Sequence, residues 1–412
     1  MASTARKGPL DGVLVLDLSR VLAGPWATQM LGDLGAEVIK VERPGEGDDT
    51  RAWGPPFVTG ADGAPGDAAY FLCANRNKRS LTVDLATPEG AALVRALAAR
   101  ADVLVENFKA GALAKYGLDP AALRQANPRL VYCSITGFGH TGPYAARAGY
   151  DAMIQAMGGL MSITGPADGA PSGEPMKVGV AVADLFAGMY AASAVLAALL
   201  HARATGEGQH IDMALFDAQA AMLANQASNY FVSGVAPGRL GSGHPNLAPY
   251  QPYRTRDGAL VIAVGNDGQF GALCRAIGEA ALGEDERFVT NALRVKHRLA
   301  LNDLLQGALA RRTTADWITA LEAAGVPCGP INSIDQVFAE PQAVARELVV
   351  EQDRADLPGP IRTVASPMRL SATPVSYRRA PPILGADTGA VLSEYLGLSQ
   401  DEIAALQAKG VV

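Results

Sequence analysis

Short apolar segments alternate with segments of helical periodicity along the first third of the chain. The runs Val13–Leu18 and Glu37–Glu42 are typical of buried strands, because each is short, rich in Val, Ile and Leu, and bounded by polar residues or glycine. Between them, Pro25–Leu34 carries apolar residues near a period of 3.6, and a proline suits the first turn of a helix. This strand–helix–strand pattern predicts two parallel strands joined by a right-handed crossover.

The same alternation recurs further along the chain. Ser80–Leu85, Val103–Val105 and Leu130–Ile135 have strand patterns, and Gly90–Arg100 has a helix pattern. We therefore expect an α/β fold whose open parallel, Rossmann-like sheet carries helices on both faces. The last of these strands runs into the glycine-rich loop Thr136–Pro143, at the strand end where open α/β sheets bind ligands.

A long apolar stretch follows the glycine-rich loop. Val178–Ala183 has a strand pattern, Asp184 interrupts the apolar residues, and Leu185–Arg203 predicts a helix that Gly206 ends. The uncharged part of this helix, Leu185–Leu200, is shorter than the roughly 18 residues of a membrane span. We interpret it as a buried helix and expect no membrane insertion.

The second half of the chain predicts a smaller domain. Residues 233–253 are rich in Gly, Pro and Asn, and strand and helix patterns of a new domain follow them. The Pro-rich residues 366–384 indicate a return towards the first domain. The predicted division is a large Rossmann-like domain over 1–225, a smaller α+β domain with its linkers over 226–330, and a return segment over 331–412 that completes the large domain.

Charge and composition narrow the function. The 412 residues hold 35 Lys and Arg against 41 Asp and Glu, a net charge of −6, which argues against a chain that coats nucleic acid. The four cysteines are far apart and the five histidines include no pair at metal-ligand spacing, so no metal site is expected. Met1–Leu10 is too short and too polar for a signal peptide, and we expect a cytoplasmic protein.

Common catalytic signatures are missing. The turn Ser19–Pro25 lacks the G-x-G-x-x-G pattern that lets backbone approach a dinucleotide pyrophosphate, so NAD is not expected. The chain has no G-x-x-x-x-G-K-[ST] loop and no G-x-S-x-G nucleophile elbow. These absences make the commonest nucleotide triphosphatases and α/β hydrolases poor candidates.

The residues alone leave two interpretations of Asp184. It is either a helix N-cap, which accepts a backbone N–H, or a carboxylate nucleophile held at a helix start. Three basic clusters also have two interpretations each: a solvated surface patch, or part of a site for one large anionic ligand. These clusters are Asn75–Arg79, Lys40 with Arg43, and Lys109 with Lys115.

Sequence blocks in order along nearly the whole chain resemble the family III CoA-transferases, the group of formyl-CoA transferase and carnitine CoA-transferase. The blocks are Leu10–Asp17, Ala23–Pro25, Leu34–Glu42, Asn77–Ser80, Val105–Phe108, Gly325–Pro330 and Leu384–Val412. The resemblance implies that Asp184 is the nucleophile, that a coenzyme A thioester is a substrate, and that no cofactor is bound permanently. It also implies a ring-shaped chain in an interlocked homodimer. The residues it assigns to CoA binding are Leu22, Ala23, Arg43, Val83, Asn107, Phe108, Lys115, Gly137, Phe138 and Gly139.

A closer resemblance is to the succinate–hydroxymethylglutarate (glutarate) branch of that family. It rests on Arg20–Pro25, Glu42–Arg51, Trp53–Phe57, Ala148–Ala152 and Ile163–Pro166. Leu22 and Thr136 replace a glutamine and a lysine of formyl-CoA transferase, and the tetraglycine flap of that enzyme is absent, which argues against oxalate as acceptor. This resemblance implies CoA transfer from succinyl-CoA to a dicarboxylic acid such as glutarate or 3-hydroxy-3-methylglutarate.

Other functions stay open at this point. Malate, citramalate, itaconate and mesaconate are alternative acceptors. An acyl-CoA racemase would use Asp184 with a histidine such as His140, and a non-catalytic CoA-binding protein would need no nucleophile. Charge type alone makes Arg20, Arg51, Arg76 and His244 candidates for binding the distal carboxylate of the substrate.

Overall fold

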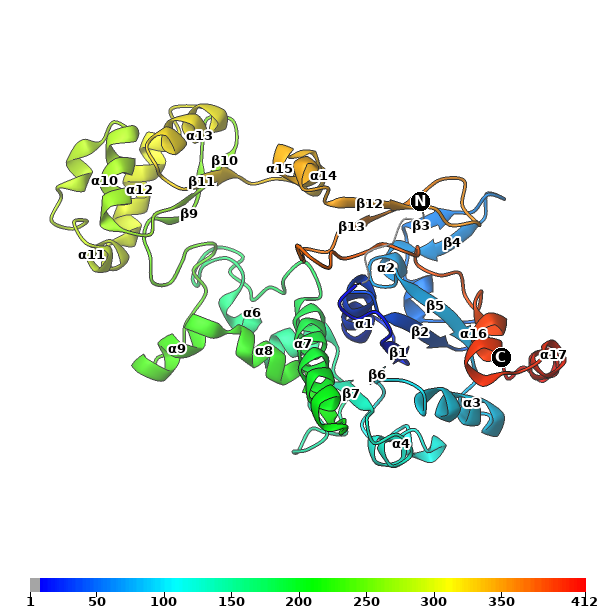
Figure 1. Ribbon diagram of the computed structural model, residues 1–412. Coiled ribbons are helices and arrows are strands. Elements are labelled where there is room, and N and C mark those ends of the chain that lie inside the picture. Colours follow the sequence, from blue (N-terminus) through cyan, green and yellow to red (C-terminus); the bar gives the residue numbers. More distant parts are fainter. Residues whose placement is uncertain (1–7) are drawn as a thin grey trace. The chain divides into compact units, whose positions relative to one another are not determined.

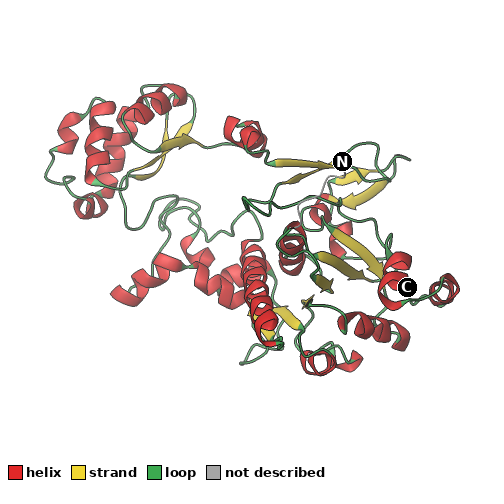
Figure 2. Ribbon diagram, viewed as in Figure 1, coloured by secondary structure: helices red, strands yellow, loops and turns green. Residues whose placement is uncertain are grey.

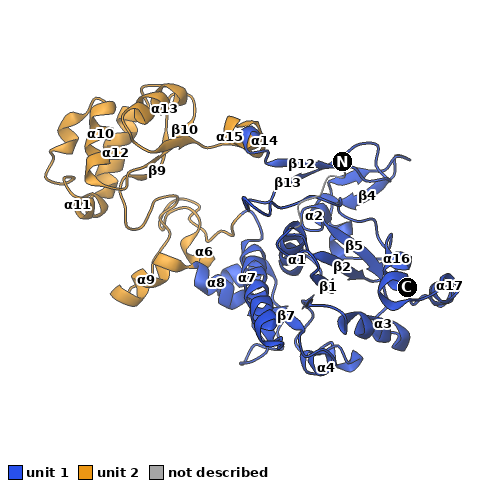
Figure 3. Ribbon diagram, viewed as in Figure 1, with its two compact units in different colours: residues 1–158, 179–222, 344–412 blue, residues 159–178, 223–343 orange. Residues whose placement is uncertain are grey.

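The computed structural model describes residues 8–412. The prediction that the chain has no signal peptide concerns Met1–Leu10, and most of these residues lie outside the described ones. The described chain forms two compact units (Figure 3). The first takes in the chain up to Gly158, with Gly179–Met222 and Val344–Val412. The second takes in Gly159–Val178 with Leu223–Ala343. The predicted domain boundaries stay predictions; these units differ from them by assigning residues 159–178 to the second unit and by starting the return segment at 344.

A six-stranded parallel sheet forms the centre of the first unit (Figure 1). Its strand order is β5-β2-β1-β6-β7-β8. The strands are β1 (Leu14–Asp17), β2 (Glu37–Glu42), β5 (Lys78–Thr82), β6 (Val103–Glu106), β7 (Val131–Thr136) and β8 (His210–Ala214). Every residue of β1, β6 and β7 is buried, as the continuous apolar runs predicted. The prediction of an open parallel α/β sheet is confirmed.

Helices cover both faces of this sheet (Figure 2). On one face lie α1 (Ala23–Asp33), α7 (Val182–Thr205) and α8 (Leu215–Met222), with one apolar core between them and the sheet. On the other face a second core joins the sheet to α3 (Pro88–Ala98), α4 (Pro120–Ala126), α16 (Thr388–Leu396) and α17 (Gln400–Ala408). The central strands therefore have no solvated face, and a ligand reaches them at the strand ends.

The strand expected over Val178–Ala183 is absent, because α7 already begins at Val182. Val180 is 56% exposed, so this apolar run is not buried as a sheet strand would be. Asp184 consequently lies inside the first turn of α7. The predicted helix end is confirmed, since Gly206 follows α7 with a left-handed φ of +81°.

Close packing fixes α7 against α1. A Cβ added at Gly188 would lie 2.6 Å from the carbonyl oxygen of Ala23, so only glycine allows the two helices to approach this closely. Within residues 8–412, α7 is the one helix long and apolar enough to span a membrane, and its alanine-rich side is buried in the first core. This close contact places the start of α7 beside the start of α1.

Shorter elements complete the first unit. They are η1 (Asp49–Ala52), β3 (Phe57–Thr59), β4 (Pro65–Ala68), α2 (Ala69–Leu72), η2 (Ala114–Tyr116), α5 (Asp151–Met157), β12 (Val349–Gln352) and β13 (Ile361–Val364). The pairs β3–β4 and β12–β13 are two-stranded antiparallel hairpins, which the sequence analysis did not predict.

The return segment supplies contacts that close the first unit. The guanidinium of Arg378 donates to the carbonyls of Gly32, Gly35 and Ala36, at the C-terminal end of α1. Thr388 Oγ1 accepts the backbone N–H of Thr82 on the edge strand β5, at 3.0 Å. The last part of the chain thus satisfies backbone groups of its first part.

The second unit has its own core. A three-stranded antiparallel sheet in the order β11-β10-β9 packs with helices around the buried side chains of Phe270, Phe288 and Trp317. Its elements are α6 (Leu160–Ile163), α9 (Ala224–Ser233), β9 (Tyr250–Arg254), β10 (Ala259–Ala263), α10 (Asp267–Ala276), η3 (Ala280–Gly283), α11 (Asn291–Lys296), α12 (Arg298–Leu309), α13 (Thr314–Ala323), β11 (Cys328–Pro330) and α14 (Ile334–Ala339). The helix α15 (Pro341–Ala345) leads back to the first unit. This mixed composition agrees with the predicted α+β character of the smaller part.

Candidate active site

The strand order places a crevice at the carboxyl end of the sheet. From β1 the chain crosses to β2 on one side, and later returns to place β6 on the other side of β1. Loops after β1 and β6 therefore diverge, which is where open α/β sheets bind ligands. The two loops are tied together, because the N–H of Arg20 donates to Asn107 Oδ1 at 2.9 Å and Asn107 Nδ2 donates to the Arg20 carbonyl at 2.7 Å.

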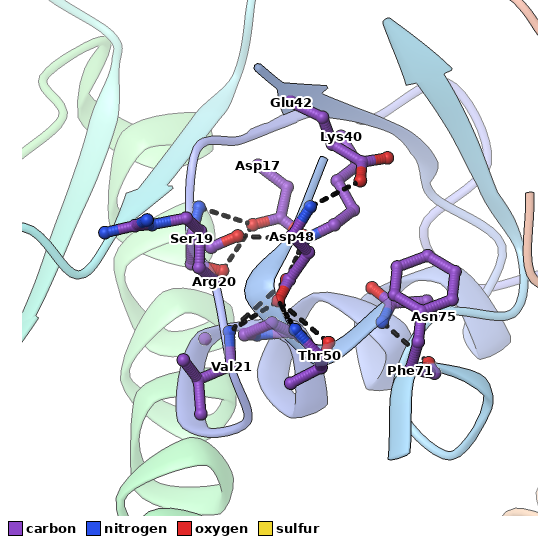
Figure 4. Close-up of polar contacts among 12 residues, drawn as sticks. Asp17, Ser19, Arg20, Val21, Lys40, Glu42, Asp48, Thr50, Phe71 and Asn75 are labelled. Carbon is purple, nitrogen blue, oxygen red and sulfur yellow. Dashed lines mark hydrogen bonds and ion pairs between the residues drawn. The ribbon is translucent and has the colours of Figure 1, made fainter. Parts of the chain in front are cut away.

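Buried charges hold the loop after β1 in an uncommon conformation (Figure 4). Val21 has a φ of +69°, which is rare for a β-branched residue, and its N–H donates to the carboxylate of Asp48. Lys40 Nζ donates to Asp48 Oδ2 at 2.8 Å and to the carbonyl of Ser19 at 2.9 Å. Thr50 donates to the same carboxylate through its N–H and its hydroxyl. The strain at Val21 is thus held by contacts on both sides of the loop.

These charges are fully desolvated. The side chains of Lys40 and Asp48, and those of Lys78 and Asp17, are 0% exposed. Burial alone would raise the pKa of Asp48, but the ammonium of Lys40 outweighs it and lowers that pKa to about 2. Burial lowers the pKa of Lys78 to about 8 in spite of its bond to Asp17. Two basic residues that the sequence left open as surface charges, Lys40 and Lys78, are therefore structural.

Two cavities of about 590 and 570 Å³ open at this crevice. Arg20, Asp49, Trp53 and Phe108 line both of them. Of the residues predicted to bind CoA, the first cavity is lined by Arg43, Val83 and Phe108, and the second by Leu22, Ala23, Asn107, Phe108 and Gly137. The shared residues make the two cavities neighbouring parts of one groove, which is suited to an elongated ligand.

Asp184 lines the second cavity, and its side chain is partly buried. Burial raises the pKa of this carboxyl to about 7, and the nearby carboxylate of Asp151 adds to the rise. In the chain from residue 8 onward, no hydrogen bond or ion pair satisfies the Asp184 carboxyl. Asp151 in turn accepts the N–H of Ala183 at 2.9 Å, which fixes the first turn of α7. Such a carboxyl, unpartnered and facing a cavity, is a candidate nucleophile.

The glycine-rich loop borders the same cavity only in part. A Cβ at Gly137 would lie 2.6 Å from the Cα of Gly149, so glycine is required where these backbones cross. Phe138 and Gly139 do not line either cavity: Phe138 packs on Tyr144 and Phe216, and the N–H of Gly139 donates to Thr136 Oγ1 at 2.9 Å. Their assignment as CoA contacts stays a prediction that the lining of the two cavities does not support.

The predicted phosphate contacts are exposed. Arg43 lines the first cavity and pairs with Glu46, both more than half exposed. Lys115 is exposed and lies 4.7 Å from the ring centroid of Tyr116, which lines the first cavity, but Lys115 itself does not line it.

Three of the four candidates for binding the distal carboxylate either form buried ion pairs or belong to the second unit. The guanidinium of Arg51 is buried against Glu42 and Asp67, and that of Arg76 is buried against Asp33. His244 belongs to the second unit. Of the four candidates, only Arg20 lines the cavity that contains Asp184.

A racemase would need a histidine beside Asp184, and a metal centre would need a cluster of ligand side chains. The described lining of the Asp184 cavity contains no histidine, and His140 lies instead beside a small cavity of about 70 Å³ with Glu106. Among residues 8–412, no group of three or more His, Cys, Asp or Glu side chains is placed to hold a metal ion.

Sequence reasoning missed three residues near Asp184. Asp49 pairs with Arg20, and Arg147 lies with its guanidinium 4.4 Å from the ring centroid of Tyr144. Burial raises the pKa of Tyr70 to about 12, and the charge of Asp184 contributes to that rise, so Tyr70 stays protonated beside the candidate nucleophile. Asp49 and Arg147 lie within or beside the sequence blocks Glu42–Arg51 and Ala148–Ala152, which gave no role for the individual side chains. Tyr70 had no signal in the sequence, because its ring meets that of Trp53 only in the fold.

Known proteins were compared with the chain. The model of the family described as CoA-transferase family III matches residues 10–388. A succinate–glutarate CoA-transferase of Agrobacterium fabrum is 55% identical over 392 residues, which cover 94% of this chain and 96% of that protein. A succinyl-CoA:glutarate CoA-transferase of Mus musculus is 45% identical, over 98% of this chain and 90% of that protein. A crystal structure of a CaiB/BaiF family protein from Brucella suis has a TM-score of 0.83 at 51% identity, and covers 94% of this chain and 100% of that one.

Proposed function

The chain belongs to CoA-transferase family III, and from this premise we propose that it moves CoA from succinyl-CoA to glutarate or 3-hydroxy-3-methylglutarate. That it is a CoA-transferase follows from the family match and from relatives bearing that name along nearly its full length. The two acids are proposed because relatives at 55% and 45% identity are named for succinate and glutarate. The observation that carries the chemistry is the unpartnered carboxyl of Asp184 in the groove that the two cavities form.

In the proposed mechanism Asp184 attacks the thioester carbonyl of succinyl-CoA. A mixed anhydride of Asp184 and succinate forms, and CoA leaves as a thiolate. The thiolate then attacks the Asp184 carbonyl, which releases succinate and leaves an aspartyl-CoA thioester. The carboxylate of glutarate attacks that thioester and again expels the thiolate, which finally attacks the glutaryl carbonyl to give glutaryl-CoA and free Asp184. Each step exchanges one acyl bond for another, so the energy of the thioester is conserved.

Exclusion of water is essential for this route, because an anhydride or an enzyme thioester hydrolyses readily. The partial burial of Asp184, which raises its pKa, supports such a protected site. We also propose the cytoplasm as the location and an interlocked homodimer of ring-shaped chains as the assembly. Both rest on the sequence and on the family resemblance.

Two competing functions differ in what they require at the site. A racemase needs a second acid–base group, and the histidine considered for that role, His140, lies outside the Asp184 cavity. A non-catalytic CoA-binding protein gives no reason for a carboxyl held unpaired with a pKa near 7. Malate, citramalate, itaconate and mesaconate remain alternative acceptors within the transferase reading.

The proposal is tested with the purified protein and succinyl-CoA. Glutarate, 3-hydroxy-3-methylglutarate, malate, citramalate, itaconate, mesaconate and oxalate are offered separately, and each new acyl-CoA is identified by its mass. We expect the highest kcat/KM with glutarate or 3-hydroxy-3-methylglutarate and the lowest with oxalate. Exchange of an α-proton on a branched acyl-CoA, without transfer to any acid, would establish the racemase function instead.

The pH dependence follows from the raised pKa of Asp184. Only the carboxylate can attack the thioester, so kcat/KM for succinyl-CoA is expected to fall about tenfold per pH unit below a pKa of about 7. The Asp151→Asn variant removes the neighbouring negative charge but keeps an oxygen that can accept the Ala183 N–H. It should therefore move this acid limb to lower pH. A limb near pH 4 in the wild-type enzyme, or one that Asp151→Asn leaves in place, would contradict this assignment.

A further inference from the structure

The backbone of Arg20 is held more firmly than a surface arginine requires. Asn107 bonds both its N–H and its carbonyl, Lys40 bonds the carbonyl of Ser19 before it, and Asp48 bonds the N–H of Val21 after it. These contacts hold Val21 in a strained, left-handed backbone conformation with a φ of +69°. Because hydrogen bonds on both sides hold this strained backbone in place, we infer that the site depends on the orientation of the side chains of the loop.

The side chain of Arg20, by contrast, is held weakly. Its guanidinium pairs with Asp49 at 3.0 Å, with both side chains 49% exposed, and lies 5.6 Å from the ring centroid of Phe108. An ion pair this exposed adds little stability, because water solvates both charges nearly as well. Asp49 can therefore be replaced by an incoming anion at small cost, while the backbone stays in place.

The position of Arg20 indicates which anion would replace Asp49. Arg20 lines the cavity that contains Asp184 and also the neighbouring one, so under the proposed function it would lie beside both the acyl group and the CoA chain. We propose that Arg20 exchanges Asp49 for the distal carboxylate of the dicarboxylic acyl group, and so selects dicarboxylic over monocarboxylic substrates. This inference rests on the proposed function. A guanidinium binds a carboxylate in a bidentate fashion, which would also orient the thioester carbonyl at the other end of the acyl chain towards Asp184.

A phosphate of CoA is the other anion that could bind this guanidinium. Butyryl-CoA separates the two sources, because it has every phosphate of succinyl-CoA and an acyl chain of equal length without the distal carboxylate. Binding of both thioesters is measured by calorimetry to Asp184→Ala, which has no nucleophile at this position, and to the double variant Asp184→Ala/Arg20→Gln. Since binding needs no turnover, a failed transfer assay in wild-type enzyme and a failed result here are distinguishable.

We expect Arg20→Gln to weaken succinyl-CoA on the order of 10- to 100-fold, the usual loss of a charge-assisted bond, and to change butyryl-CoA by less than about twofold. Arg43→Gln is the matched control: as a predicted phosphate contact it should weaken both thioesters equally. Equal weakening by Arg20→Gln would assign Arg20 to a phosphate and overturn the proposal. Unchanged binding of both thioesters would overturn it as well.

Asp49→Asn provides a test of opposite sign. It removes the carboxylate that competes for Arg20, so succinyl-CoA should bind about two- to fivefold more tightly, in line with the small energy of an exposed pair. The gain should vanish when Asp49→Asn is combined with Arg20→Gln, and it should be absent for butyryl-CoA. Weaker binding of succinyl-CoA to Asp49→Asn would show that Asp49 positions Arg20 rather than competing with the substrate, which contradicts the exchange.

Discussion

The Asp184→Ala variant is expected to lose CoA transfer by a factor on the order of 10⁴ or more, because the alanine methyl group cannot form the covalent intermediate. Wild-type enzyme mixed with succinyl-CoA should gain the mass of CoA less one water, which corresponds to the aspartyl-CoA thioester. Peptide mapping should locate this adduct at Asp184, and the variant should show none. Hydroxylamine, which cleaves thioesters, should remove the adduct from the wild-type enzyme.

The neighbouring carboxylate provides the control for this result. Asp151→Asn keeps the hydrogen-bond acceptor of Ala183 and leaves Asp184 in place, so the adduct should still form. Circular dichroism is recorded for both variants to establish that the helix content of the chain is unchanged. If Asp184→Ala still forms a CoA adduct at wild-type rate, the nucleophile is a different residue.

Lys40→Met is expected to cost the first unit about 3–5 kcal/mol, because it leaves Asp48 charged in a site without water. The measurement is amide hydrogen exchange in β1 and β2 as a function of urea, which reports the first unit separately from the second. Arg362→Met is the matched control, since its pair with Glu351 is 67% and 60% exposed and should contribute within about 0.5 kcal/mol. Equal costs for the two variants would contradict the structural role of the buried pair.

A double variant separates stability from binding. Lys40→Met/Asp48→Leu removes both charges, so part of the lost stability should return. The N–H of Val21 then has no carboxylate to bind, and the loop that carries Arg20 and Leu22 loses one of its supports. We therefore expect succinyl-CoA to bind more weakly to the double variant than to wild-type enzyme, although part of the stability has returned. Wild-type affinity in a refolded double variant would show that the pair only stabilises the unit.

The parallel sheet could be predicted from the sequence because its central strands are buried on both sides and therefore read as unbroken apolar runs. The same reasoning failed at Val178–Ala183, where the central Val180 is exposed and the run leads into α7. It could not reveal the β3–β4 hairpin either, since the strand Pro65–Ala68 contains Pro, Gly and Asp, and two of its four residues are exposed. Apolarity identifies burial, and strands without burial leave no such signal.

The candidate site was predictable only in part. Asp184 could be found because a carboxyl between apolar residues needs an explanation, and the family resemblance supplied its proposed role. Lys40 carries no such signal: its partner Asp48 lies eight residues away, and only the fold removes water from both. The pair of Arg20 and Asn107 joins positions 87 residues apart, so it depends on β6 lying next to β1. Contacts of this kind are set by the strand order and are invisible in a local pattern.

The return of the last 69 residues to the first unit has a consequence for synthesis on the ribosome. The backbone carbonyls at the end of α1 accept hydrogen bonds from Arg378, and the N–H of Thr82 on β5 donates to Thr388. Arg378 and Thr388 are among the last residues to be synthesised, so these backbone groups lack their partners for most of translation. The whole of residues 223–343 is translated in between. We therefore expect the unit that contains Asp184 to reach its final form only after translation has nearly ended, so that a nascent or prematurely terminated chain does not consume acyl-CoA.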